Sequence, residues 1–464
     1  MLFTVVLLPL RMAALGRLLD PTTFGVMAVI LVVSGLAQVV GELGLSEATI
    51  QHEDPDRNEL STIYWLNLMS GALVYSVVFI FTPLISLFFK LPELRVLLPV
   101  SSLSFLVLPF GSQFAALLQK DLNFRYLSFV DVSSLFTNTL VSIVLAWYGA
   151  GVWSLVFGEL SGVSLRTIIL FVHGVRKKRL PSFYFSLRLI RGYLKFGLHR
   201  VGAMTINFFN SRVDQLVIGA LLGPQALGYY SMSFNLVIQP VNQISPVLTK
   251  VAFPVFCRIK DDLSGVKNGY LKILRLLLSV NAPVLLGISV VSPVAIPLFL
   301  GGEWVPAVPV VQILCFYTLF RSVSNAGGAV VLAKGRADLT FYWNIAILAV
   351  VPLVISVVGW FTRDLITVSL SLCVLQLFFV FANYKYLVFK SVGPCFNSYM
   401  SSILVPTSLA LIMAIFVFFA GSAVDFGTLW LNLSFQVSLG VVIYSVLFFC
   451  VRNDDAKSLM RIFR

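Results

Sequence analysis

The sequence contains few charged residues, few cysteines and few histidines. Only 11% of its 464 residues are charged, whereas soluble domains carry about a quarter. The 5 cysteines and 3 histidines are scattered, with no CxxC pair and no histidine at metal-ligand spacing. We interpret the cysteines as ordinary small apolar residues. No stretch is polar enough to form a sizeable soluble domain.

Apolar residues dominate the chain instead. They make up 58% of it, and the mean hydropathy is +0.94. Apolar runs of about 20 residues, the length that crosses a bilayer, recur with only short interruptions. Because lipid offers the backbone no hydrogen-bond partners, such runs are expected to be helical. The sequence therefore predicts an all-α polytopic membrane protein.

The apolar N-terminal segment, residues 1–10, has no basic region before it. We interpret it as part of a first span and not as a cleaved signal peptide. It is short for a span, which raises the question of whether residues precede it. In all, the sequence predicts about fourteen spans. Their expected ranges are 1–17, 23–48, 60–89, 96–119, 126–148, 152–174, 193–222, 225–256, 270–300, 305–333, 340–361, 365–388, 397–420 and 428–450.

Basic residues lie mainly at the ends of these spans and indicate an orientation. The most basic connection, between the sixth and seventh spans, carries Arg176, Lys177, Lys178, Arg179, Arg188, Arg191 and Lys195. Alternate loops share this charge through Arg258, Lys260, Lys267, Lys334, Arg336, Lys385, Lys390, Arg452, Lys457, Arg461 and Arg464, whereas the opposite loops hold chiefly Lys90, Arg95 and Arg363. The positive-inside rule therefore predicts that both termini are cytoplasmic. Topology accounts for most of the +13 net charge, and nucleic acid is not indicated as a partner.

A short sequence recurs in the second half of the chain. Leu18–Gly25 (LLDPTTFG) returns as Leu221–Gly228 (LLGPQALG), and Leu118–Phe124 is echoed in the same order by Leu332–Phe341. Each pair lies at corresponding span boundaries, which indicates a parallel duplication of a six-helix unit followed by two extra helices. The alternative is that such loop signals recur by chance.

The duplication defines the predicted domains. They are a six-helix bundle at 1–174, a basic cytoplasmic linker at 175–192, a second six-helix bundle at 193–390, and two additional helices with a cytoplasmic tail at 391–464. A parallel repeat of this kind places a binding cavity between its halves and suits alternating access.

Several ionisable residues lie within the predicted spans. Each costs roughly 2.5–3.5 kcal/mol to insert, so each is expected to face a polar cavity or a partner. The candidate substrate-binding residues are Arg11, Glu42, Glu159, Arg166, Arg200, Arg212, Asp214 and Lys250. Arg212 and Asp214 are two residues apart on one helix and are not expected to face each other.

The arginines favour an anionic ligand, because the planar guanidinium can bind phosphate through two hydrogen bonds. Arg166, Arg200 and Arg212 are the candidates for contact with a diphosphate or an acidic sugar. The alternative is pairing between helices or snorkelling to the interface, which is favoured for Arg200 and Lys250 near span ends. Coupling to protons or sodium stays open, since no chain of acids marks a relay.

Segments along nearly the whole chain resemble one family of transporters. The similar segments are Arg17–Gly25 to its ArLLsPedFG opening, Gly149–Leu155 to its GxGxWaL, Asp214–Gly219 to its DnlliG, and Leu222–Tyr230 to its LGpealGyY, with further agreement at Phe253–Phe256, Gly302–Ala307 and Lys334–Leu339. This family is the polysaccharide transporters of the multidrug/oligosaccharidyl-lipid/polysaccharide exporter superfamily. Within it, the colanic acid and teichuronic acid exporters are the most similar.

The resemblance implies an activity. It implies translocation of an undecaprenyl-diphosphate-linked oligosaccharide from the cytoplasmic to the periplasmic leaflet of the bacterial inner membrane, with no cofactor. The implied partners are this lipid-linked oligosaccharide, membrane lipids, a polysaccharide polymerase and glycosyltransferases. Arg212 and Asp214 lie in the matching span, whereas Glu47 stands where the family usually has a small residue.

Two other functions fit the residues less well. A cation-coupled multidrug antiporter of the same superfamily would be expected to carry an excess of acids in its cavity, but arginines are at least as numerous here. A membrane saccharide polymerase or ligase would need a sizeable outer loop with catalytic residues. The predicted outer loops are too short to hold such a constellation.

The predicted orientation can be tested by cysteine labelling, in a chain whose natural cysteines are replaced by alanine. Lys177→Cys is expected to react with a membrane-impermeant maleimide only after cells are opened, because the basic loop faces the cytoplasm. Ala150→Cys, in a predicted outer loop, is expected to react in intact cells. Labelling of Lys177→Cys in intact cells would reverse the orientation.

Overall fold

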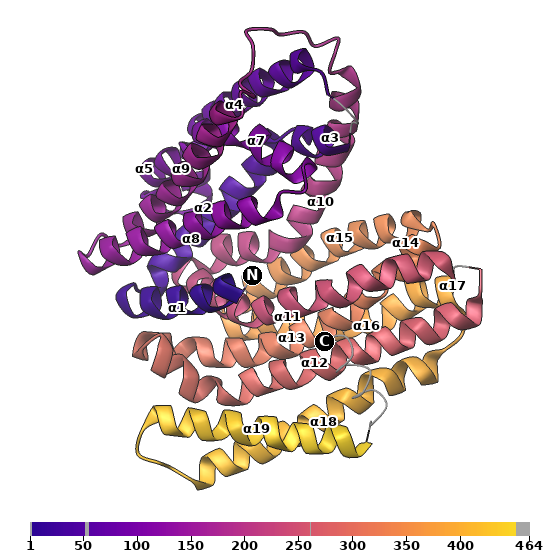
Figure 1. Cartoon of the computed structure of the whole chain (residues 1–464). Helices are drawn as coiled ribbons and strands as arrows, with labels where there is room; N and C mark the ends of the chain where they lie inside the picture. Colours follow the sequence, from indigo (N-terminus) through magenta and orange to yellow (C-terminus); the bar gives the residue numbers. More distant parts are fainter. Residues whose placement is uncertain (1, 52–54, 260, 452–464) are drawn as a thin grey trace. The chain divides into compact units, whose positions relative to one another are not determined.

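The computed structural model describes residues 2–51, 55–259 and 261–451 (Figure 1). Within these residues the structure contains helices and no strand, which confirms the predicted all-α class. The chain divides into two compact units, residues 1–228 and 229–464. The domain boundaries predicted near residues 174, 192 and 390 follow the sequence repeat instead, and they stay predictions.

The first unit contains the helices α1 to α10. Their bounds are α1 Leu2–Leu18, α2 Pro21–Gly41, α3 Leu45–Gln51, α4 Arg57–Phe89, α5 Leu94–Ser102, α6 Ser104–Val107, α7 Pro109–Lys120, α8 Phe124–Trp147, α9 Val152–Arg176 and α10 Arg191–Leu222. Helices α8 and α9 pack against each other, and α9 also packs against α7. Helix α10 packs against α2.

The second unit contains most of α11 and all later helices. Their bounds are α11 Pro224–Arg258, α12 Leu263–Phe299, the 3-10 helix η1 Gly302–Ala307, α13 Val308–Ala326, α14 Gly328–Ala333, α15 Ala337–Thr362, α16 Leu365–Asn383, the π-helix η2 Tyr384–Val388, α17 Phe389–Val392, α18 Phe396–Ala423 and α19 Leu429–Val451. Helix α12 packs against α13, α18 and α19. The last two helices lie side by side, drawn in yellow in Figure 1.

Each of the fourteen predicted spans coincides with one helix or with consecutive helices. In the described part of the chain, 10 helices are long and apolar enough to cross a membrane, or 11 if the bent stretch from α5 to α7 is one span. The other predicted spans correspond to α1, α10 and α11, which are shorter or more polar. The predicted number of spans is consistent with this arrangement.

Two spans are broken where continuous helices were expected. In the span predicted at 23–48, α2 ends at Gly41, and the chain turns through Leu43 and Gly44 with φ of 48° and 63° before α3 begins. In the span predicted at 96–119, the helix bends by 46° at the break before Pro109. Proline has no backbone N–H for the preceding turn, which explains this second break.

Acidic side chains fix where several helices begin. Asp20 caps α2 by accepting a hydrogen bond from the backbone N–H of Thr23 at 3.3 Å. Asp364 caps α16 in the same way, through Thr367 at 2.9 Å. Each cap satisfies a backbone donor that the first turn leaves unpaired, so the short loops end at defined residues.

The two copies of the repeated sequence contact each other. A Cβ atom on Gly25 would lie 1.7 Å from the carbonyl oxygen of Pro224, and one on Gly228 would lie 1.8 Å from the carbonyl oxygen of Pro21. These residues are equivalent pairs in the repeat, so the contact is reciprocal, as in a two-fold interface. Only glycine lets two backbones approach this closely. The contact is the one expected from a duplicated unit.

The reciprocal contact can be tested with one substitution made at two glycines. Gly25→Ala is expected to destabilise the protein by about 1–3 kcal/mol, because its methyl group collides with backbone that cannot move aside. Gly202→Ala, in α10, is the matched control, since a Cβ there meets no atom within 4 Å. It is expected to be neutral or slightly stabilising.

The measurement is the midpoint of thermal unfolding of each purified variant in detergent. A lower midpoint for Gly25→Ala alone supports the contact. Equal midpoints for the two variants would contradict it.

Candidate functional site

A polar cavity lies inside the first unit, between α2, α4, the α5–α7 stretch and α9. We call it the α2–α9 cavity, and it is lined by Gln38, Gly41, Glu42, Ser46, Asn67, Gly71, Val74, Phe105, Leu108, Pro109, Ser112 and Arg166. Its volume is about 90 Å³, which holds a few water molecules but no saccharide. It brings together Glu42 and Arg166, two of the candidate residues.

Both charged residues of this cavity have partners at its edge. The Nε of Arg166 lies 2.9 Å from Oδ1 of Asp131 on α8, and the Arg166 side chain is 33% exposed while that of Asp131 is 55% exposed. Glu42 accepts a hydrogen bond from Nε2 of Gln38 at 2.9 Å. The ion pair joins α8 to α9, and the Arg166 guanidinium also lines the cavity, where it could contact an anionic ligand.

A second polar group joins α1, α8 and α9. Asn138 donates a hydrogen bond from Nδ2 to Oε2 of Glu159 at 2.8 Å, and its own Oδ1 accepts from Ser142 at 3.2 Å. Arg11 of α1 interacts electrostatically with Glu159. Glu159 thus takes part in a hydrogen bond between α8 and α9, and Arg11 lies close enough for its charge to attract that of Glu159.

The two candidates on α10 meet through a third residue. Arg212 donates from Nη1 to Oε1 of Gln215 at 3.1 Å, and Oδ1 of Asp214 accepts from the backbone N–H of Gln215 at 2.8 Å. Asp214 is only 6% exposed. Because the hydrogen-bond partner of Arg212 is a neutral amide, its positive charge is available to a ligand that reaches α10.

Two candidates, Arg200 and Lys250, are left. Arg200 is exposed on α10. Lys250 belongs to α11, but its side chain lies outside the described residues. Glu42 and Arg166 therefore line one cavity, Arg11 lies within electrostatic reach of Glu159, and Gln215 is hydrogen-bonded to both Arg212 and Asp214.

The sequence analysis did not predict that neutral amides are the hydrogen-bond partners of the charged residues. Gln38, Asn138 and Gln215 each hold one of the candidate charged groups. The signal that could have found them is an asparagine or glutamine inside an otherwise apolar span, because a polar group in lipid needs a partner for the same reason as a charge.

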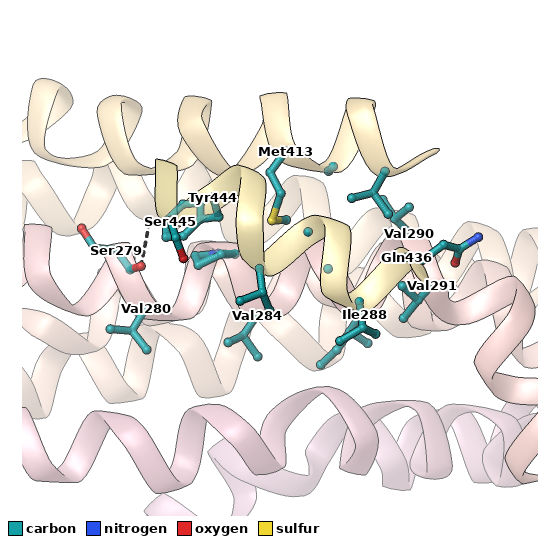
Figure 2. A pocket seen from close by; sticks show the side chains of 17 residues that line it. Ser279, Val280, Val284, Ile288, Val290, Val291, Met413, Gln436, Tyr444 and Ser445 are labelled. Atoms are coloured by element: carbon teal, nitrogen blue, oxygen red, sulfur yellow. Dashed lines mark hydrogen bonds between the residues drawn. The ribbon is translucent and has the colours of Figure 1, made fainter. Parts of the chain in front are cut away.

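The second unit contains a larger and mostly apolar groove. We call it the α12–α19 groove; its volume is about 450 Å³, and it is lined by Ser279, Val280, Pro283, Val284, Gly287, Ile288, Val290, Val291, Met413, Ala414, Val417, Gln436, Val437, Gly440, Val441, Tyr444 and Ser445 (Figure 2). Helices α12, α18 and α19 supply these residues. From Ser279 to Val291 the groove follows α12 for roughly 18 Å.

Polar groups lie at the two ends of this groove. Figure 2 shows Tyr444 and Ser279 at one end and Gln436 at the other, with valines and Ile288 between them. The hydroxyl of Tyr444 donates to the carbonyl oxygen of Ser279 at 2.7 Å. The middle of the groove offers a ligand only apolar contacts, so it suits a hydrocarbon chain better than a headgroup.

The long apolar helices define a polytopic membrane protein. Its fold is similar to that of the lipid II flippase MurJ in an inward closed conformation, with a TM-score of 0.77, 16% identity, and 98% of this chain and 99% of that chain covered. It is also similar to an inward-facing multidrug resistance MATE family transporter, with a TM-score of 0.64, 13% identity, and 86% and 95% covered. These likenesses concern the fold alone.

Sequence comparison assigns the family. Residues 14–309 match the family described as polysaccharide biosynthesis protein. The chain is 31% identical to the lipopolysaccharide biosynthesis protein WzxC of Escherichia coli K12, with 86% of this chain and 81% of WzxC covered. It is 30% identical to the teichuronic acid biosynthesis protein TuaB of Bacillus subtilis 168, with 92% and 88% covered. The chain therefore belongs to this polysaccharide biosynthesis family, as its motifs indicate.

Proposed function

We propose that this protein moves a lipid-linked oligosaccharide, a precursor of a surface polysaccharide, from the cytoplasmic to the outer leaflet of a bacterial inner membrane. The observation that carries the proposal is a transporter fold in a chain whose relatives are named for lipopolysaccharide and teichuronic acid biosynthesis. A polysaccharide assembled on a membrane lipid must cross the bilayer before it reaches the surface. A transporter in this family supplies that step.

Such a cargo consists of a polyprenyl tail, a diphosphate and an oligosaccharide. The structure offers a suitable surface for the tail and for the diphosphate. The polyprenyl tail is apolar and suits the α12–α19 groove, whose middle is lined by Val284, Ile288 and Val291. The diphosphate is anionic and suits Arg166 and Arg212, whose present partners are an exposed carboxylate and a neutral amide. Arg11 fits this role less well, because it already interacts with Glu159.

The proposal also covers the ion that drives transport and the proteins that act before and after it. Asp214 and Glu42 are the acids that proton coupling would use, and sodium is the other candidate ion. We expect no cofactor. A polymerase and glycosyltransferases would act after and before this step, and both termini would face the cytoplasm.

The proposal is tested in a strain that lacks this chain, complemented with wild type, Arg212→Ala or Asp214→Ala at equal expression. The empty strain is expected to lose its surface polysaccharide and to accumulate lipid-linked oligosaccharide. Each variant is expected to export several-fold less than wild type, because Arg212→Ala removes a cation that would bind the diphosphate and Asp214→Ala removes an acid that proton coupling would use. Surface polysaccharide and extracted lipid-linked oligosaccharide are measured together.

The two readouts test the proposed transport and the role of Arg212 and Asp214 separately. An empty strain with normal polysaccharide and no accumulation would contradict the proposed function. Full export by both variants, with loss in the empty strain, would leave the function standing and remove Arg212 and Asp214 from the site.

The α12–α19 groove is tested by replacing a glycine in its lining with a larger apolar residue. Gly287 lines the groove, and a Cβ on it would meet no atom within 4 Å. Gly287→Leu is therefore expected to occupy the tail's place without a clash in the helix, and to lower export several-fold at an unchanged thermal midpoint. Gly202→Leu is the matched control, since Gly202 is equally open but lies on α10. Normal export by Gly287→Leu would exclude the groove as the tail site.

A further inference from the structure

A second polar cavity lies at one end of the first unit, apart from the α2–α9 cavity. It is formed by three segments far apart in sequence, and it is lined by Pro55, Arg57, Leu60, Ser61, Gln113, Leu117, Lys120, Asp121, Lys178, Arg179, Leu180 and Pro181. We call it the basic cavity. Its volume is about 350 Å³. The three segments belong to connections that the basic-residue pattern places on the same, cytoplasmic side.

The lining of the basic cavity carries a positive charge. Four of the residues above are basic and one is acidic, which gives +3. Asp121 is paired with Arg179, with Oδ2 and Nη1 2.7 Å apart. Arg57 and Lys178 are exposed, and neither side chain forms an ion pair with another described residue. The cavity therefore has cationic groups left over for an anion.

Backbone N–H groups at the start of α4 are already hydrogen-bonded and are not free to bind an anion. Asp56 accepts from the backbone N–H of Arg57 at 2.7 Å, and Glu59 accepts from the backbone N–H of Asp56 at 3.0 Å. These acids occupy donors at the N-terminus of the helix. An anion in the cavity would be bound by side chains.

The basic segment after α9 is held in place by hydrogen bonds to α4. The hydroxyl groups of Ser61 and Ser182 lie 2.9 Å apart, and Nε1 of Trp65 donates to the carbonyl oxygen of Ser182 at 3.0 Å. The ring of Phe183 stacks on Trp65 with centroids 5.6 Å apart. Lys178 and Arg179 thus lie in a segment whose position is fixed, which lowers the entropy lost when they bind a ligand.

A buried amide in the wall also lacks a partner. Gln113 is only 3% exposed, and its Oε1 has no hydrogen-bond partner among the described residues. An amide oxygen accepts hydrogen bonds, so a ligand that carries a hydroxyl group beside its phosphate would satisfy it. A buried polar atom left unpaired is otherwise unfavourable.

We infer that the basic cavity binds a phosphate-bearing headgroup at the cytoplasmic leaflet. Arg57 and Lys178 contact the phosphate, and Gln113 accepts from a hydroxyl group of the same ligand. An anionic phospholipid and the diphosphate of a lipid-linked saccharide share this chemistry. The second source rests on the proposed function, whereas the first does not.

The test measures binding to the purified full-length chain and needs no transport. One arm adds inorganic pyrophosphate to protein in detergent, and the other compares nanodiscs of phosphatidylglycerol with nanodiscs of phosphatidylcholine. The readouts are the thermal midpoint and, for the lipid arm, phosphatidylglycerol retained in native mass spectrometry. The variant is Arg57→Gln with Lys178→Gln. The control is Arg125→Gln with Lys177→Gln, which removes the same charge from residues that do not line the cavity.

Wild type and the control are expected to respond to at least one arm, and the variant is expected to bind about tenfold more weakly. A response to phosphatidylglycerol identifies a phospholipid headgroup, and a response to pyrophosphate alone identifies a diphosphate. No response in either arm, or equal loss in variant and control, would overturn the inference. None of these binding results would decide whether the protein transports its cargo, because transport is measured separately in cells.

Discussion

Lipid cannot form hydrogen bonds, so every polar or charged side chain within a span of this protein needs a partner in the protein or in water. The partners that the structure provides decide what each charge can do. Glu159 accepts a hydrogen bond from Asn138, which ties α9 to α8, and its charge attracts that of Arg11. Arg166 is paired with the carboxylate of Asp131, whereas Arg212 donates to the neutral amide of Gln215 and keeps a charge that a ligand can use. The same constraint that stabilises the bundle thus separates structural charges from candidate binding charges.

The surfaces described here match an amphipathic cargo. The α12–α19 groove offers a hydrocarbon chain apolar contacts along its middle and keeps polar groups at its ends. The arginines of the first unit suit a diphosphate, which a drug or an inorganic cation does not carry. Family membership points to the same kind of cargo, because the relatives serve polysaccharide biosynthesis.

The spans, the duplication and the family could be predicted because each leaves a local pattern. Apolar runs mark spans, and the repeated Leu-Leu-x-Pro segments mark equivalent loops, whose glycines then meet in the structure. The break at Leu43 and Gly44 was missed, because apolar residues on both sides hide a turn that only tertiary packing stabilises. The groove was missed for a similar reason, since Val284 or Ile288 looks the same in sequence whether it faces lipid, another helix or a cavity. Pairing of charges also depends on which helices are neighbours, so Asp131 on α8 could not be named in advance as the partner of Arg166 on α9. Gln215, three residues after Arg212 on α10, could have been named from helix spacing alone.

We propose that this chain carries a lipid-linked oligosaccharide across a bilayer. The most direct test of this proposal is translocation in vesicles that contain the purified protein and the host's lipid-linked oligosaccharide, with a membrane-impermeant glycosidase outside. The account predicts that glycans of the inner leaflet become accessible to the enzyme over time in vesicles with the protein and stay protected in vesicles without it. Equal protection in both preparations, with the protein shown to be folded, would contradict the account.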